Sequence, residues 1–176
     1  MTTVLAIDRG NDSLKAALFS EGLIAERIRL AEGDPGDALD LIRRVRPDGI
    51  AVSCVVPAWR AAVEAALSDE PRAAILWAGH GSPLPFSVDV ADPAAVGPDR
   101  LCAVAGVVGR GIASAVVVDA GTAVTVDVLK EGEFIGGSIM PGLDLMLRSL
   151  GRGTAVLPSL DSSQALASSA GTLLRI

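Results

Sequence analysis

The sequence predicts an α/β fold in which one unit occurs twice, so that the chain forms two lobes. Apolar strands alternate with helices over the first hundred or so residues, as in α/β sheet proteins. The segment VLAIDRGND at residues 4–12 then has a counterpart in VVVDAGTAV at residues 116–124. Both place an Asp, any residue, Gly and a polar side chain after an apolar strand, and both continue into a second strand. We expect lobes at residues 1–113 and 114–176, with a ligand held between them.

The elements of the first lobe follow from hydrophobic periodicity and from the residues that start and stop helices. Asp37 is a candidate N-cap, and Pro47 stops the same helix. Strands are expected at 3–7, 13–20, 49–56 and 73–79, and helices at 34–47, 57–70 and 98–109.

Composition and charge exclude several classes of protein. The 176 residues are 50% hydrophobic and carry a net charge of -6, with only two lysines among 15 basic residues. Such a chain has no basic stripe for nucleic acid or for an anionic membrane. It starts with no signal-like segment, and Arg110 interrupts its longest apolar region, so we expect a cytoplasmic protein. Cys54 and Cys102 fit buried, reduced thiols.

The Asp-x-Gly turns could hold phosphate. A glycine in a tight turn lets backbone N–H groups approach a phosphate, and an Asp at the strand end can hold Mg²⁺. One such turn is more often only a turn, but two copies behind buried strands could cradle a nucleotide triphosphate between them. The sequence contains no G-x-x-x-x-G-K-[ST] motif, and no G-x-G-x-x-G motif opens a helix.

A further acidic and basic pair stands in VGPDR, residues 96–100. Asp99 could accept a proton from a hydroxyl group, and Arg100 could pair with a carboxylate or a phosphate. The alternative is a simple helix N-cap. FIGGSIMPG at 134–142 is interpreted as a tight connection from a strand to a helix, and His80 as a loop residue.

Together these motifs resemble the type III pantothenate kinases, a family with the actin-like (ribonuclease H-like) fold. The resemblance runs from about residue 4 to residue 169. It depends on the order and spacing of six segments: DRGN, SCVVP, DPAAVGPDR, VVDAGTAVTVD, GEFIGGSIMPG and TAVLP. It implies a homodimer that uses ATP to phosphorylate pantothenate to 4′-phosphopantothenate, the first step of coenzyme A biosynthesis.

The resemblance also assigns roles at the substrate. Asp99 would be the general base, Arg100 would bind the pantothenate carboxylate, and Gly97 would line the pocket. Val90 takes the place of a family Tyr that touches pantothenate, and Ser162 takes the place of a family Thr.

At the nucleotide, the first turn would hold phosphate and Mg²⁺, and the second would hold phosphate and a monovalent cation, K⁺ or NH₄⁺. The first turn comprises Asp8, which would bind Mg²⁺, with Gly10 and Asn11; the second comprises Gly121 and Thr122, with Asp119 at the monovalent cation.

The chain departs from the family pattern at several places. Asp12 stands where the family has a hydroxyl residue, so its carboxylate would repel phosphate unless it turns away or binds a metal. The chain ends at Ile176, before the late T-G-G motif that contacts adenine, so we expect an incomplete second lobe with exposed apolar sheet surface. These departures keep open a weakly active or inactive paralogue that binds pantothenate or regulates a partner. A different small-molecule kinase or phosphatase of the same superfamily is a further alternative.

Overall fold

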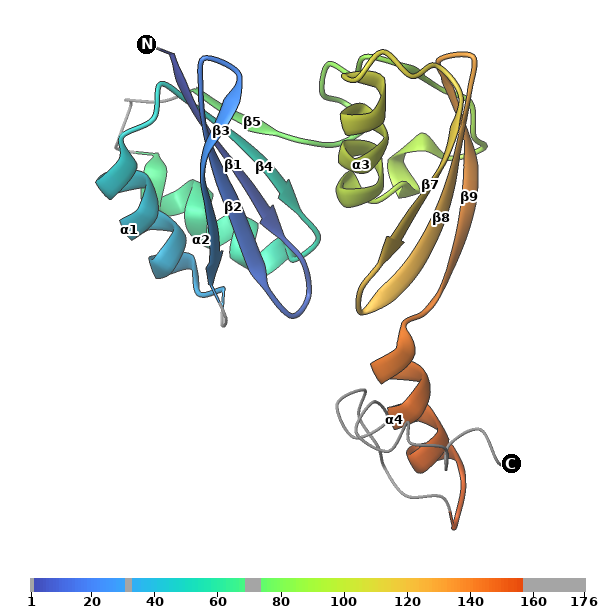
Figure 1. The fold of residues 1–176 in the computed structure, drawn as a ribbon. Coiled ribbons are helices and arrows are strands. Elements are labelled where there is room, and N and C mark those ends of the chain that lie inside the picture. The colour runs from blue at the N-terminus through green and yellow to red at the C-terminus, as the bar shows by residue number, and fades with distance from the viewer. Residues whose placement is uncertain (1, 31–32, 69–73, 157–176) are drawn as a thin grey trace.

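The computed structural model describes residues 2–30, 33–68 and 74–156. In this part of the chain two sheets lie side by side, each packed against helices (Figure 1). The first sheet has five strands in the order β3-β2-β1-β4-β5. They are β1 (Thr3–Arg9), β2 (Leu14–Ser20), β3 (Leu23–Leu30), β4 (Gly49–Cys54) and β5 (Ala74–Trp77). β1 runs antiparallel to β2 and parallel to β4.

Two helices cover one face of this sheet, α1 (Pro35–Val45) and α2 (Pro57–Leu67). Successive side chains of a strand point to opposite faces, so Leu5 and Ile7 of β1 enter the core, where α2 contributes Trp59 and Val63. The β1 residues that alternate with Leu5 and Ile7 point to the opposite face of the sheet, toward the second lobe. This alternation leaves one sheet face open toward the space between the lobes.

The N-terminus of α1 differs from the prediction. Asp34 is the N-cap, and its Oδ1 accepts a hydrogen bond of 2.6 Å from the backbone N–H of Gly36. The prediction of Asp37 was wrong because Pro35, whose fixed φ suits the first helical position, starts the helix one turn earlier. Asp37 lies in the first turn, where its charge complements the helix dipole.

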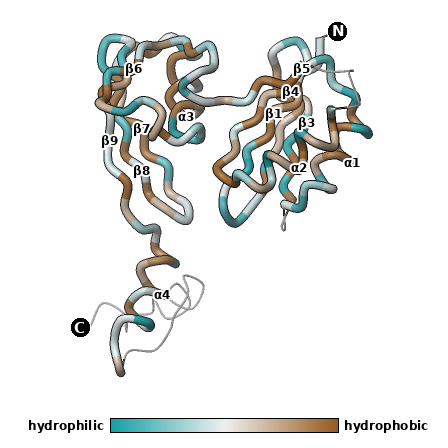
Figure 2. The backbone as a smooth tube through the Cα atoms, turned by 180° about the vertical axis from the view of Figure 1, so that it is seen from behind, coloured by the Kyte–Doolittle hydropathy of each residue, from teal (hydrophilic) through white to brown (hydrophobic). Residues whose placement is uncertain are grey.

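The second sheet has four strands in the order β6-β9-β8-β7. They are β6 (Ser87–Val88), β7 (Ala115–Ala120), β8 (Ala123–Lys130) and β9 (Glu133–Pro141). A short 3-10 helix (Pro93–Ala95) precedes α3 (Pro98–Val108), which packs on the inner face of this sheet and also contacts β4 of the first sheet. A second buried cluster forms there from Val96, Leu101, Val104, Leu129 and Phe134. Apolar stretches run along β1, β4 and α3 in Figure 2.

The strand–turn–strand unit occurs in both sheets, as β1–β2 and as β7–β8. The region before residue 113 contributes to both, because β6 pairs with β9 while α3 lies between the two sheets. The boundary at residue 113 therefore stays a prediction, and it refers to where the second strand–turn–strand unit begins.

The outer face of the second sheet is apolar and exposed. Val116 and Val118 are 64% and 61% exposed, and Met140 on the same face is 42% exposed. The helix α4 (Leu143–Gly153) extends away from both sheets in Figure 1 and buries none of its side chains. The expected exposure of sheet surface in the second lobe is confirmed. Within the described ranges, no helix has the length and apolar character needed to span a membrane.

Candidate active site

A cavity of about 350 Å³ lies where β1, β4, α3 and β7 meet. Three carboxylates line it, from three different elements: Asp8, Asp99 and Asp119. Two of these elements belong to different sheets, and α3 lies between the sheets. The structure thus brings together the three acidic residues that the sequence analysis assigned to catalysis and to cation binding.

The strand register explains why Asp8 and Asp119 face this cavity. Asp8 follows the core residue Ile7 in β1 and so points to the open face, opposite Ser53 of β4. Asp119 lies near the end of β7, opposite Thr125 of β8. Each carboxylate therefore stands just before its turn.

The two turns close in similar ways. The N–H of Gly10 donates to the carbonyl of Ser13 at 3.1 Å, and the N–H of Gly121 donates to the carbonyl of Ala123 at 2.9 Å. These two N–H groups are engaged within their own turns, so a phosphate would have to bind to other donors there. Asn11 is exposed in the first turn, where Arg9 Nη1 donates to its carbonyl at 3.1 Å.

The turns also contact each other across the lobes. Thr122 Oγ1 donates to Asp12 Oδ2 at 2.5 Å. The carboxylate that replaces the expected hydroxyl residue therefore accepts a hydrogen bond from the second turn. A phosphate that binds Thr122 has to compete with Asp12 for its hydroxyl group.

Gly97 makes room for Asp99. Gly97 is the N-cap of α3, and a Cβ at this position would lie 2.4 Å from Asp99 Oδ1. The same oxygen accepts the backbone N–H of Arg100 at 2.9 Å. A side chain at position 97 would therefore displace the carboxylate, which gives the glycine of the G-x-D-R motif a positioning role.

Arg100 is held by a residue that the sequence analysis did not select. Its Nε donates to Asp127 Oδ1 at 2.8 Å, and its Nη2 donates to the same oxygen. The Asp127 side chain is 1% exposed and that of Arg100 is 12% exposed. Asp127 Oδ2 is buried and has no hydrogen-bond partner in the described part of the chain. The guanidinium also lies over the Phe134 ring, 5.6 Å from its centroid.

The glycines of FIGGSIMPG allow close backbone contacts. A Cβ at Gly137 would lie 2.1 Å from the Val126 carbonyl oxygen, and one at Gly142 would lie 2.0 Å from the Gly121 carbonyl oxygen. β9 continues through residue 141, so Gly136 and Gly137 belong to the strand and only the end of the motif forms the connection. Gly137 and Gly142 are small because the backbone at these positions lies close to β8 at Asp127 and to the second turn, respectively.

Among the described residues, the predicted substrate contacts other than Asp99 do not line the cavity. Gly97 and Arg100 lie next to Asp99 at the start of α3 but are not among the lining residues, and Val90 packs against the second hydrophobic cluster. Ser162, like the segment expected at a dimer contact, lies outside the described residues. Both cysteines are free, and neither is fully buried, which differs from the expectation.

Cys102 lines the cavity, and the pKa of its thiol depends on the carboxylates nearby. The pKa of its thiol is raised above the ordinary value, first by desolvation against the cavity wall and then by the negative charges of Asp8 and Asp99. A raised pKa leaves less thiolate near neutral pH, and the thiolate is the nucleophile. Cys102 is therefore expected to react slowly despite its accessible position.

An alkylation experiment tests this charge effect. In a Cys54→Ser background, Asp99→Asn should lower the Cys102 pKa toward its ordinary value and speed alkylation by iodoacetamide at pH 8. The measurement is the pH profile of the alkylation rate, whose midpoint should move to lower pH. An unchanged midpoint would show that the carboxylate of Asp99 does not act on the thiol.

The donor set fits cations that share their ligands with phosphate. No group of three or more His, Cys, Asp or Glu side chains in the described ranges could hold a metal ion by itself. Mg²⁺ commonly takes one or two carboxylates and completes its shell with water and substrate phosphates. Asp8 and Asp119 offer such oxygens at one cavity.

The architecture defines the class. The chain has the duplicated, two-lobed actin-like (ribonuclease H-like) fold with a shortened second lobe. MreB5 of Spiroplasma citri bound to ADP superposes with a TM-score of 0.50 at 11% identity, over 94% of this chain and 60% of that one. A Campylobacter jejuni protein described as a Baf family transcriptional activator gives a TM-score of 0.52 at 20% identity, over 86% and 61%.

Within this class, the chain belongs to the type III pantothenate kinase family, whose family model matches residues 4–173. The type III pantothenate kinase of Chlorobaculum parvum is 35% identical over 168 residues, which cover 89% of this chain and 62% of the relative. That of Akkermansia muciniphila is 35% identical over 170 residues, with 92% and 67% covered. The chain thus spans about two thirds of the length of these relatives.

Proposed function

We propose that this chain phosphorylates pantothenate to 4′-phosphopantothenate with ATP, the first step of coenzyme A biosynthesis. The observation that carries the proposal is the convergence of Asp8, Asp99 and Asp119 on one cavity where the two lobes meet. Family membership supplies the substrate class. Phosphoryl transfer depends mainly on positioning and on charge neutralisation, which suits a site of carboxylates and turns.

Asp99 acts as the general base in this proposal. Its carboxylate takes the proton of the substrate hydroxyl group while that oxygen bonds to the γ-phosphorus, and the bond between this phosphorus and the β,γ-bridging oxygen breaks to release ADP. Gly97 keeps the carboxylate in place because a Cβ there would overlap Oδ1. The contact between Asp99 and the Arg100 N–H fixes the base at the start of α3.

Arg100 binds the substrate carboxylate through the N–H groups that Asp127 leaves available. Nε and one N–H of Nη2 donate to Asp127, so both N–H groups of Nη1 and the second N–H of Nη2 remain for the substrate. We assign phosphate binding to the turns around Gly10, Asn11, Gly121 and Thr122. Mg²⁺ held by Asp8 and a monovalent cation held by Asp119 would neutralise charge on the phosphates.

We also propose a cytoplasmic homodimer with units at residues 1–113 and 114–176. The exposed outer face around Val116 and Val118 supports association, because apolar patches of this kind favour burial against a partner. Analytical ultracentrifugation of the full chain would contradict the dimer if it found only monomer at micromolar concentration.

Product formation by the purified 176-residue chain tests the activity. With ATP, Mg²⁺ and K⁺ we expect 4′-phosphopantothenate, and we expect turnover to fall when Na⁺ replaces K⁺ at constant ionic strength. Mass spectrometry of the product gives the result independently of ATP hydrolysis. No product from chain that circular dichroism shows to be folded would overturn the proposal.

A further inference from the structure

Ser53 of β4 is buried, and its hydroxyl group has no hydrogen-bond partner among the described residues. The residue is 6% exposed. Buried polar groups in native proteins are nearly always paired, and an unpaired one costs stability. Neither the packing of β4 nor the roles proposed for the neighbouring carboxylates explains why a serine stands at this position.

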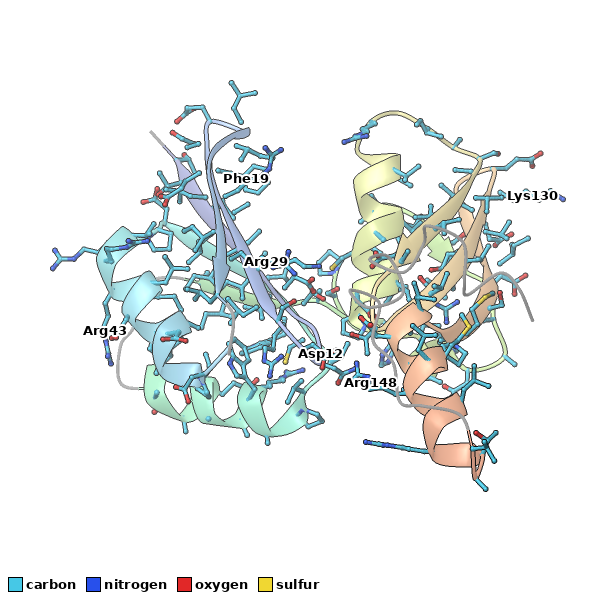
Figure 3. All side chains as sticks on the ribbon, turned by 60° about the horizontal axis from the view of Figure 1, so that its bottom comes forward. Asp12, Phe19, Arg29, Arg43, Lys130 and Arg148 are labelled. Atoms are coloured by element: carbon cyan, nitrogen blue, oxygen red, sulfur yellow. The ribbon has the colours of Figure 1, made fainter. Side chains whose placement is uncertain are left out.

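Ser53 lines the cavity beside the residues proposed for phosphoryl transfer. Val52 enters the core, so the side chain of Ser53 points to the opposite face of the sheet, directly beside Asp8 in the parallel pair of β1 and β4. The two strands end together, next to the turn of Asp12, which Figure 3 shows between the two lobes. The unpaired hydroxyl group is therefore at the place where the two lobes meet.

The first turns of α3 face Ser53 across this corner of the cavity. Asp99 and Cys102 both line it, and their spacing of three residues places them on one side of the helix. The pKa of the Cys102 thiol is raised by burial and then by Asp8 and Asp99. The Ser53 hydroxyl acts in the opposite direction, so it lies beside the thiol. A thiol is only a weak hydrogen-bonding group, which leaves Ser53 available to a stronger partner.

The reacting hydroxyl group of an alcohol substrate is such a partner. The alcohol that Asp99 deprotonates has to lie between this carboxylate and Asp8, and Ser53 lies on the wall between them. When χ1 of Ser53 turns between its staggered positions, no existing hydrogen bond is broken. An alcohol oxygen that donates its proton to a carboxylate keeps two lone pairs, one to attack phosphorus and one to accept a hydrogen bond.

We propose that Ser53 binds and orients the reacting hydroxyl group of the substrate. Its Oγ–H donates to the hydroxyl oxygen, whose own proton points to Asp99. Ser53 is thus a substrate-binding residue from the first sheet, whereas Asp99 and Arg100 come from α3. The proposal rests on the proposed function, which supplies pantothenate as the alcohol.

Two proteins and two ligands, measured in all four combinations, test this contact without turnover. Calorimetry of the full chain gives the affinity of the wild type and of Ser53→Ala for pantothenate and for 4′-deoxypantothenate, which has hydrogen in place of the reacting hydroxyl group. Ser53→Ala should weaken pantothenate binding roughly 3- to 10-fold, as for one lost hydrogen bond, and change the affinity for the deoxy ligand less than about twofold. Without ligand, its melting temperature should equal or exceed that of the wild type, since an unpaired buried hydroxyl group has been removed.

Ser87→Ala is the matched control. Ser87 also lies in a strand, but its Oγ donates to Glu133 Oε1 at 3.3 Å and it does not line the cavity. This variant should change the affinity for either ligand less than about twofold.

Equal losses of affinity for both ligands in Ser53→Ala, or no loss for either, would overturn the proposal. A melting temperature of Ser53→Ala well below that of the wild type without ligand would also overturn it, because the hydroxyl group would then have a structural role. A wild type that binds neither ligand would overturn the proposed function and this contact with it, whereas the first two results would leave the proposed function in place.

Discussion

Asp99→Asn is expected to reduce kcat by about 10²–10⁴-fold, the range typical for loss of a general base. The amide keeps an oxygen that can accept the Arg100 N–H, so the start of α3 should stay intact. KM for pantothenate and the melting temperature should change little. Rapid-quench measurement of 4′-phosphopantothenate separates the chemical step from product release.

The matched control is Asp92→Asn. Asp92 also accepts a backbone N–H, that of Ala94, at the start of a short helix, but it does not line the cavity. This variant should keep kcat within about twofold, because only the change at Asp99 removes a proton acceptor from the reacting hydroxyl group. If Asp99→Asn kept kcat within fivefold of the wild type, another group would have to accept the proton.

The main parts of the candidate site could be predicted because they depend on local patterns. Period-two alternation places Asp8 on the face opposite Ile7, and the repeat of that pattern places Asp119 in the second sheet. The helix signal before residue 98 positions Asp99. Each of these features depends on residues that are close together in the sequence. The resemblance to a family depends on the order of these segments along the chain.

The contact between Arg100 and Asp127 could not be predicted in this way, because it joins residues 27 positions apart on different elements. The strand AVTVDVLK gave one signal: Asp127 shares its face with the buried Leu129, and a carboxylate in such a position needs a partner. The strand β3 was missed for a different reason. It is an edge strand with mostly exposed side chains, so it has little hydrophobic periodicity.

Arg100→Met is expected to destabilise the second lobe by about 3–5 kcal/mol, because it removes one partner of a buried ion pair. Asp127 would be left in a fully buried position with neither oxygen hydrogen-bonded. Urea unfolding followed by far-UV circular dichroism should show a lower midpoint. Both tryptophans, Trp59 and Trp77, lie in the first lobe, so their fluorescence should shift less.

A double variant distinguishes a stranded charge from lost packing. Leu has nearly the shape of Asp, so Arg100→Met/Asp127→Leu replaces the pair by apolar side chains and should recover most of the lost stability. The control Arg43→Met breaks an exposed ion pair with Asp40 and should cost about 0.5 kcal/mol or less. If the double variant stayed as unstable as Arg100→Met, lost packing over Phe134 would be the cause and not the buried carboxylate.

The same two variants separate the effect of Arg100 on stability from its effect on substrate binding. Loss of turnover in Arg100→Met alone combines instability with loss of substrate binding, whereas a stable double variant with a raised KM for pantothenate isolates the contact to the substrate carboxylate.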